Sequence, residues 1–207
     1  MAIGFSIKPD ERINESVLAE RLNASRTPLR EALNRLVAED LLVYQQGKGF
    51  FCRPLHPKTI LDLYETRLAV ERETVRLACQ RGDKGEAVAL RQSLEPLRPG
   101  TADHATKDLV AFDEVFHEGI ARLSRNDELC RVLASINARI RFVRWIDMEN
   151  RRHVTFGEHV MIADALVARD AARADRVMSE HLDRRAEEIV AVVREGYSRI
   201  YLPQGLE

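Results

Sequence analysis

The chain has 207 residues, which is enough for one large domain or two small ones. A formal net charge of −1 excludes a uniformly basic, non-specific nucleic-acid binder. The three cysteines are widely spaced and form no Cys-x-x-Cys pair, which argues against a disulfide framework and a thiolate metal site. No apolar run reaches the roughly 18 residues of a membrane span, so we expect a cytoplasmic protein with no membrane partner.

The first unit in chain order is a pair of short amphipathic helices. Apolar residues of segment 15–23 recur at helical spacing, and the turn NAS follows. The stretch SRTPLREALNRL then begins with Ser25 as an N-cap and Pro28 in the first turn, where its missing N–H is not needed. Arg26 and Arg30 stay off the apolar stripe of this second helix. The pattern predicts a helix-turn-helix whose second helix recognises DNA.

The next segment changes from helical to alternating spacing. LLVYQQGKGFFCRPL is apolar and aromatic on both sides of a Gly-x-Gly turn, which predicts a β-hairpin. A hairpin directly after a recognition helix is a wing. Lys48 at its tip and Arg53 on its return strand are placed to meet DNA phosphates.

The rest of the chain is predicted to be an antiparallel helical bundle. Pro54 and Pro57 break the chain, so we place the domain boundary there, with a DNA-binding domain over 1–55 and an all-helical domain over 56–207. Helical periodicity then covers 58–80, 84–97, 104–123, 127–147, 153–168 and 171–195, the fourth helix being capped by Asn126 or Asp127. About six helices with short connections make the fold mostly α.

Four polar residues within these helices could bind a metal ion. The sequence DEVFH puts Asp113 and His117 four residues apart on one helix face, where both side chains can approach one ion. His159 and His181 lie on two later helices, in segments whose apolar residues recur at helical spacing. A lone histidine of this kind is more often a satisfied core or surface residue than a ligand. Spacing alone therefore leaves both interpretations open.

The motifs resemble a known family of regulators. SRTPLREALNRLVAEDLL followed by QQGKGFF is similar to the winged helix-turn-helix of GntR-type bacterial transcription regulators. DLYETRLAVERETVRLA, DEVFHEGIARLSRND and EHVMIADALVARDAARADRVMSEHL resemble the FCD ligand-binding domain of the FadR subfamily. The resemblance implies a homodimeric repressor or activator that binds double-stranded operator DNA. It also implies that DNA affinity changes when a small carboxylate binds the helical domain.

The resemblance also assigns roles to particular residues. The metal-binding FCD type uses one Asp and three His, which match Asp113, His117, His159 and His181 here. A nitrogen and oxygen set without thiolate suits a divalent transition metal, zinc before nickel or manganese. Arg67 matches an arginine that often enters the effector pocket; the alternative is an Arg67–Glu71 pair on a solvated helix face. The DNA-contacting positions match Ser25, Arg26, Thr27, Arg30, Gly47 and Lys48.

The sequence departs from the family pattern in four places. The segment GFSIKP starts almost at Met1, so the helix that usually precedes it is expected to be lacking. PDERI, AED and SRND stand where PGERL, AEG and SGN are commoner, and each change replaces a glycine.

Two other functions are compatible with parts of this pattern. A metal-dependent hydrolase or lyase could use an Asp/His site, although four protein ligands leave little room for an activated water. A metal-free acyl-CoA sensor of the same subfamily would have no need of the four ligands.

Overall fold

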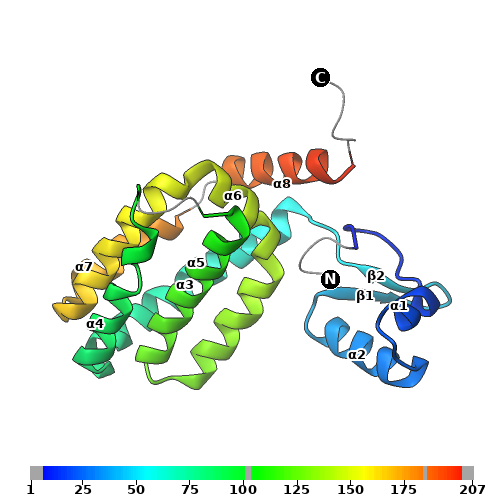
Figure 1. Ribbon diagram of the computed structural model, residues 1–207, viewed down its shortest axis with the longest axis horizontal. Helices are drawn as coiled ribbons and strands as arrows, with labels where there is room; N and C mark the ends of the chain where they lie inside the picture. The colour runs from blue at the N-terminus through cyan, green and yellow to red at the C-terminus, as the bar shows by residue number, and fades with distance from the viewer. Residues whose placement is uncertain (1–6, 101–103, 184–185, 202–207) are drawn as a thin grey trace. The chain divides into compact units, whose positions relative to one another are not determined.

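The computed structural model describes residues 7–100, 104–183 and 186–201, and most of them are helical (Figure 1). Residue contacts divide the chain into two units. One contains the described residues up to His56 and from Tyr197 onward, and the other contains those described between Pro57 and Gly196. No helix in the described ranges is long and apolar enough to cross a membrane.

The predicted helix-turn-helix and wing are both present. The elements are α1 (Glu15–Arg21), α2 (Arg26–Ala38), β1 (Leu42–Gln45) and β2 (Gly49–Cys52). The Asn14 side chain caps α1 by accepting hydrogen bonds from the backbone N–H groups of Ser16 (3.1 Å) and Val17 (3.2 Å). Ser25 precedes α2 as predicted but makes no side-chain cap bond. Within the described ranges, α1 is the first helix of the chain.

The wing is an antiparallel hairpin with a short third partner. Leu42 pairs with Cys52 and Gln45 with Gly49, and Gly49 has a φ of +95° at the turn. The segment before α1 lies along β2, because the Ile13 N–H donates to the Phe50 carbonyl at 2.8 Å. The buried side chains Ile13, Leu29, Leu33, Leu42 and Phe50 form a small core beneath this sheet. The core fixes the recognition helix against the wing.

Three residues that replace a commoner glycine adopt left-handed backbone conformations. Asp10, Asp40 and Arg125 have φ values of 61°, 62° and 54°. Such angles suit glycine and cost other residues free energy, least for Asp and Asn. The Asp40 carboxylate also accepts a hydrogen bond from the Arg53 guanidinium. Arg53 therefore pairs within the domain, and the predicted phosphate contact loses support.

The second unit is a bundle around a shared apolar core. Its elements are α3 (Pro57–Arg81), α4 (Lys84–Gln92), the short 3-10 helix η1 (Glu95–Leu97), α5 (Thr106–Leu123), α6 (Asp127–Val167) and α7 (Ala171–Leu182). The last helix, α8 (Ala186–Tyr201), belongs to this unit as far as Gly196. Val75, Phe116, Ile162 and Met178 place α3, α5, α6 and α7 around one cluster of buried side chains. Asn126 caps α6, as one of the two predicted alternatives.

Predicted helix boundaries are wrong in three places. The helix predicted over 84–97 ends at Gln92, and Glu95–Leu97 form the separate 3-10 helix η1. The segments 127–147 and 153–168 form one continuous helix, α6, of 41 residues. Because the sequence between them contains neither Gly nor Pro, the backbone hydrogen bonds continue without a break. The predicted helix 171–195 is instead two helices, because Asp183 leaves the helical region with a ψ of 122°. No Gly or Pro marks that position in the sequence.

Candidate metal and effector site

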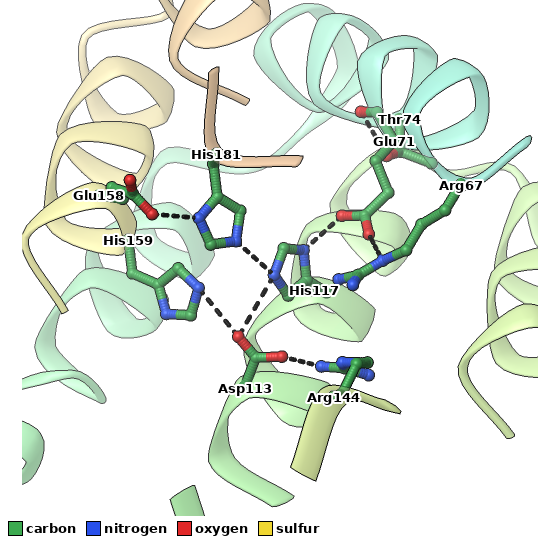
Figure 2. Close-up of polar contacts among 9 residues, drawn as sticks. All are labelled: Arg67, Glu71, Thr74, Asp113, His117, Arg144, Glu158, His159 and His181. Carbon is green, nitrogen blue, oxygen red and sulfur yellow. Dashed lines mark hydrogen bonds and ion pairs between the residues drawn. The ribbon is translucent and has the colours of Figure 1, made fainter. Parts of the chain in front are cut away.

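The four predicted ligands meet inside the helical bundle (Figure 2). Asp113 and His117 lie one turn apart on α5, His159 lies on α6, and His181 on α7. All four are buried, and one ligand atom of each lies within 4.8 Å of the others. His159 Nε2 is 3.1 Å and His117 Nε2 is 3.6 Å from Asp113 Oδ1, and the Nε2 atoms of His117 and His181 are 3.2 Å apart.

These distances fit a set of donors around a single ion. Ligand atoms bound to one transition metal at about 2.0–2.2 Å lie roughly 3–3.6 Å from each other. His159 Nε2 is buried, and its contact with Asp113 lacks the geometry of a hydrogen bond. A buried nitrogen without a hydrogen-bond partner costs free energy, and coordination to an ion would remove that cost. One carboxylate and three imidazoles could therefore hold a divalent transition metal.

Two further carboxylates orient the histidine rings. His117 Nδ1 contacts Glu71 Oε2, and His181 Nδ1 lies 2.7 Å from Glu158 Oε2. A carboxylate at Nδ1 favours a proton on that nitrogen and leaves the Nε2 lone pair free to coordinate. Sequence reasoning assigned neither acid to the site, because each reaches its histidine through tertiary packing.

Burial keeps the imidazoles neutral. It lowers the pKa of His181 to about 4 and also lowers the pKa of His117 and His159. Neutral imidazole is the form that binds metal. Burial alone would raise the pKa of Glu71, but its interactions with His117 and with the Arg67 guanidinium outweigh burial, and the net pKa is low. With His117 neutral, the Arg67 guanidinium is the main partner that keeps Glu71 ionised.

A small recess adjoins the four candidate ligands. Its volume is about 30 Å³, and its walls contain two arginines, two aspartates, two hydroxyl groups, one of the histidines and two apolar side chains. They are Tyr64, Arg67, Asp113, Arg144, Asp147, Met148, Thr155, His181 and Leu182. The recess therefore joins the predicted effector arginine to two candidate metal ligands.

Both sequence interpretations of Arg67 describe part of its environment. Its Nε donates to Glu71 Oε1 at 2.6 Å, as the ion-pair alternative proposed. The pair is buried rather than solvated, with Arg67 only 3% exposed, and the guanidinium lines the recess. Arg144, which sequence reasoning missed, contacts Asp113 Oδ2 from α6. Burial, and then the charge of Arg67, lower its pKa to about 9.

The predicted DNA-contacting residues lie on the surface of the first unit. Ser25, Arg26, Thr27, Arg30, Gly47 and Lys48 are all exposed. Arg26 Nη2 donates to Ser16 Oγ at 3.2 Å, and Arg30 lies 3.6 Å from Glu15 and over the Phe50 ring. The start of α2 and the wing tip thus offer basic side chains on the surface of one small domain.

Comparisons with known proteins identify both parts of the chain. Residues 4–52 match the bacterial regulatory proteins of the gntR family, and residues 62–184 match the FCD domain. The chain is a GntR-family transcriptional regulator with an FCD domain. It is 39% identical over 201 residues to the Nta operon transcriptional regulator of Aminobacter aminovorans, which covers 97% of this chain and 95% of that protein. It is 31% identical to the HTH-type transcriptional repressor GlaR of Escherichia coli K12, over 86% of this chain and 85% of the repressor.

Solved structures of related regulators share the fold. E. coli McbR/YncC matches with a TM-score of 0.74 at 22% identity, covering 95% of this chain and 92% of that one. A putative GntR regulator from Rhodococcus sp. RHA1 matches with a TM-score of 0.73 at 22% identity, over 91% of each chain. The relatives are DNA-binding transcriptional regulators rather than enzymes, which removes the hydrolase and lyase alternative.

Proposed function

We propose that this GntR regulator binds operator DNA as a homodimer and changes its DNA affinity when a small carboxylate binds at a metal ion in the FCD domain. Residues 1–55 form the DNA-binding domain, and 56–207 form an effector-binding and dimerisation domain of the FadR type. The observation that carries the proposal is the buried Asp/His3 group beside a recess with two guanidinium groups. The protein acts in the cytoplasm, where its operator is.

Asp113, His117, His159 and His181 would hold a divalent transition ion, for which the chemistry of the donors favours zinc over nickel and manganese. Such an ion supplies positive charge and coordination positions for carboxylate oxygens. Glu71 and Glu158 orient two of the imidazoles, and Arg67 binds the effector carboxylate through its guanidinium fork.

The recess favours a small acid over a long acyl chain. About 30 Å³ is far below the roughly 300–1,000 Å³ of pockets that enclose drug-sized ligands. Its walls are largely charged or polar, whereas an acyl chain needs an apolar tunnel. These two features argue against the acyl-CoA sensor.

The DNA-binding unit supports readout by α2 and positioning by the wing. Arg26 and Arg30 read guanine edges in the major groove, while Ser25, Thr27, Gly47 and Lys48 contact the backbone. Because each chain presents one recognition helix, a homodimer would bind two half-sites related by two-fold symmetry.

The metal assignment is tested by elemental analysis of the purified protein. Replacing His159 and His181 by Ala is expected to abolish metal retention while the far-UV circular dichroism stays helical. The matched control replaces His56 and His104, two histidines outside the cluster, by Ala. Full metal occupancy in the His159/His181 variant would refute the assignment.

A further inference from the structure

Two buried guanidinium groups line one recess. Arg67 from α3 and Arg144 from α6 are 3% and 4% exposed, and Figure 2 shows them on the same side of the Asp/His cluster. Like charges that approach each other in a buried place are unfavourable unless anions lie between or beside them. The approach is close enough for the charge of Arg67 to lower the pKa of Arg144, after burial itself.

The protein supplies only part of the acceptors that these arginines need. Arg67 Nε donates a hydrogen bond to Glu71, while Arg67 Nη2 is buried and has no hydrogen-bond partner among the described residues. Arg144 Nη2 forms an ion pair with Asp113, and Arg144 Nη1 lies 3.6 Å from Glu114, beyond hydrogen-bond distance. Both nitrogens are buried, and neither has a hydrogen-bond partner among the described residues. Each guanidinium thus keeps a buried N–H donor that a ligand oxygen could satisfy.

Separate carboxylates hold the two guanidiniums in place. Glu71, on the same helix, fixes Arg67, and Asp113 of α5 fixes Arg144. The recess therefore contains two anchored binding points for carboxylate oxygens rather than one mobile cation. The hydroxyl-bearing Tyr64 and Thr155, together with Asp147, also line it.

We infer that the effector is a short dicarboxylic acid, and that Arg144 binds its second carboxylate while Arg67 and the metal ion receive the first. The inference rests on the proposed function and narrows its ligand class. Because Arg67 and Arg144 line the same recess, one ligand can reach both guanidinium groups only if a short chain joins its two carboxylates.

The test compares acids that differ by one carboxylate. The zinc-loaded full chain is titrated calorimetrically, with zinc in slight excess, against succinate and butyrate, and against malate and 3-hydroxybutyrate. Succinate and malate are each expected to bind at least about tenfold more tightly than the matching monoacid, because the second carboxylate accepts charge-assisted hydrogen bonds from a buried arginine.

Arg144→Lys keeps a positive charge beside Asp113 but loses the guanidinium fork, so the protein is expected to fold, retain zinc and bind both acids of a pair about equally. Arg141→Lys is the matched control, since Arg141 lies on the same helix, has a side chain that is 42% exposed and does not line the recess. It should keep the wild-type preference.

Three results would overturn the inference in different ways. Equal affinity of the wild type for diacid and monoacid would remove the second carboxylate site and leave the proposed function standing. An unchanged preference in the Arg144→Lys variant would remove the role of Arg144. Failure of every acid to bind the zinc-loaded wild type would refute the proposed effector site itself.

Discussion

Glu71→Gln is expected to destabilise the helical unit strongly, although the two side chains have almost the same size. Glu71 is fully buried and bonds both Arg67 Nε and His117 Nδ1. Glutamine removes the negative charge and leaves the Arg67 guanidinium buried without its counter-charge. Breaking a buried ion pair by removing one partner costs about 3–5 kcal/mol.

The cost should be visible as a large fall in Tm. In a protein of this size, 1 kcal/mol corresponds to roughly 2–4 °C, so the expected shift is roughly 6–20 °C. The assay is thermal unfolding followed by far-UV circular dichroism at neutral pH, on chelator-treated protein so that metal binding does not contribute.

Glu73→Gln provides a matched control on the same helix. Glu73 accepts two hydrogen bonds from Arg76, at 2.8 and 2.6 Å, but both side chains are more than two-fifths exposed. Solvent screens such a pair, so the control should shift Tm only slightly. If the two variants unfold at the same temperature, the buried Arg67–Glu71 pair does not contribute the expected free energy to stability.

Two further predictions concern pH and DNA. Because burial lowers the pKa of His181 to about 4, the unfolded chain binds a proton below about pH 6.5 that the folded chain does not. As the pH falls from about 6.5 towards about 4, the unfolding free energy of chelator-treated protein should therefore fall by about 1.4 kcal/mol per pH unit from this residue alone. Equal urea midpoints at about pH 7.5 and about pH 5.5 would contradict this. Arg26→Ala should weaken binding to an operator selected from random duplexes by about 1–3 kcal/mol, measured by fluorescence anisotropy. Arg35→Ala, at the far end of α2, is its control. An equal loss of DNA affinity in the two variants would contradict the assignment of the recognition surface to the start of α2.

Local signals in the sequence were sufficient to predict most of the fold. The Asn126 cap, the Gly-x-Gly wing tip and Pro57 at the start of α3 mark element ends through the bonding and φ preferences of single residues. Two of the wrong boundaries lie where no such residue stands. For α6, the absence of Gly and Pro between the two predicted segments was itself a signal of one continuous helix, whereas the break after Leu182 has no local signal in the sequence.

The candidate site was predictable only in part for a related reason. Helical spacing could pair Asp113 with His117 because they share one helix, and it could also pair Arg67 with Glu71. Adding His159 and His181 required the family resemblance, since they come from other helices. The two orienting acids and Arg144 belong to no local motif. Their roles depend on distances between helices that are far apart in sequence.

The polar centre of the bundle is costly in terms of stability alone. An apolar core formed by Val75, Ile120 and Ile162 lies in the same unit, and replacing buried ion pairs by such side chains is often neutral or stabilising. The buried charges instead make each helix depend on groups carried by another. Glu71 of α3 holds a ring from α5, and Arg144 of α6 holds a carboxylate from α5. An ion and an acid bound at this centre would therefore change the free energy of packing among α3, α5, α6 and α7, which is the coupling that an effector domain needs.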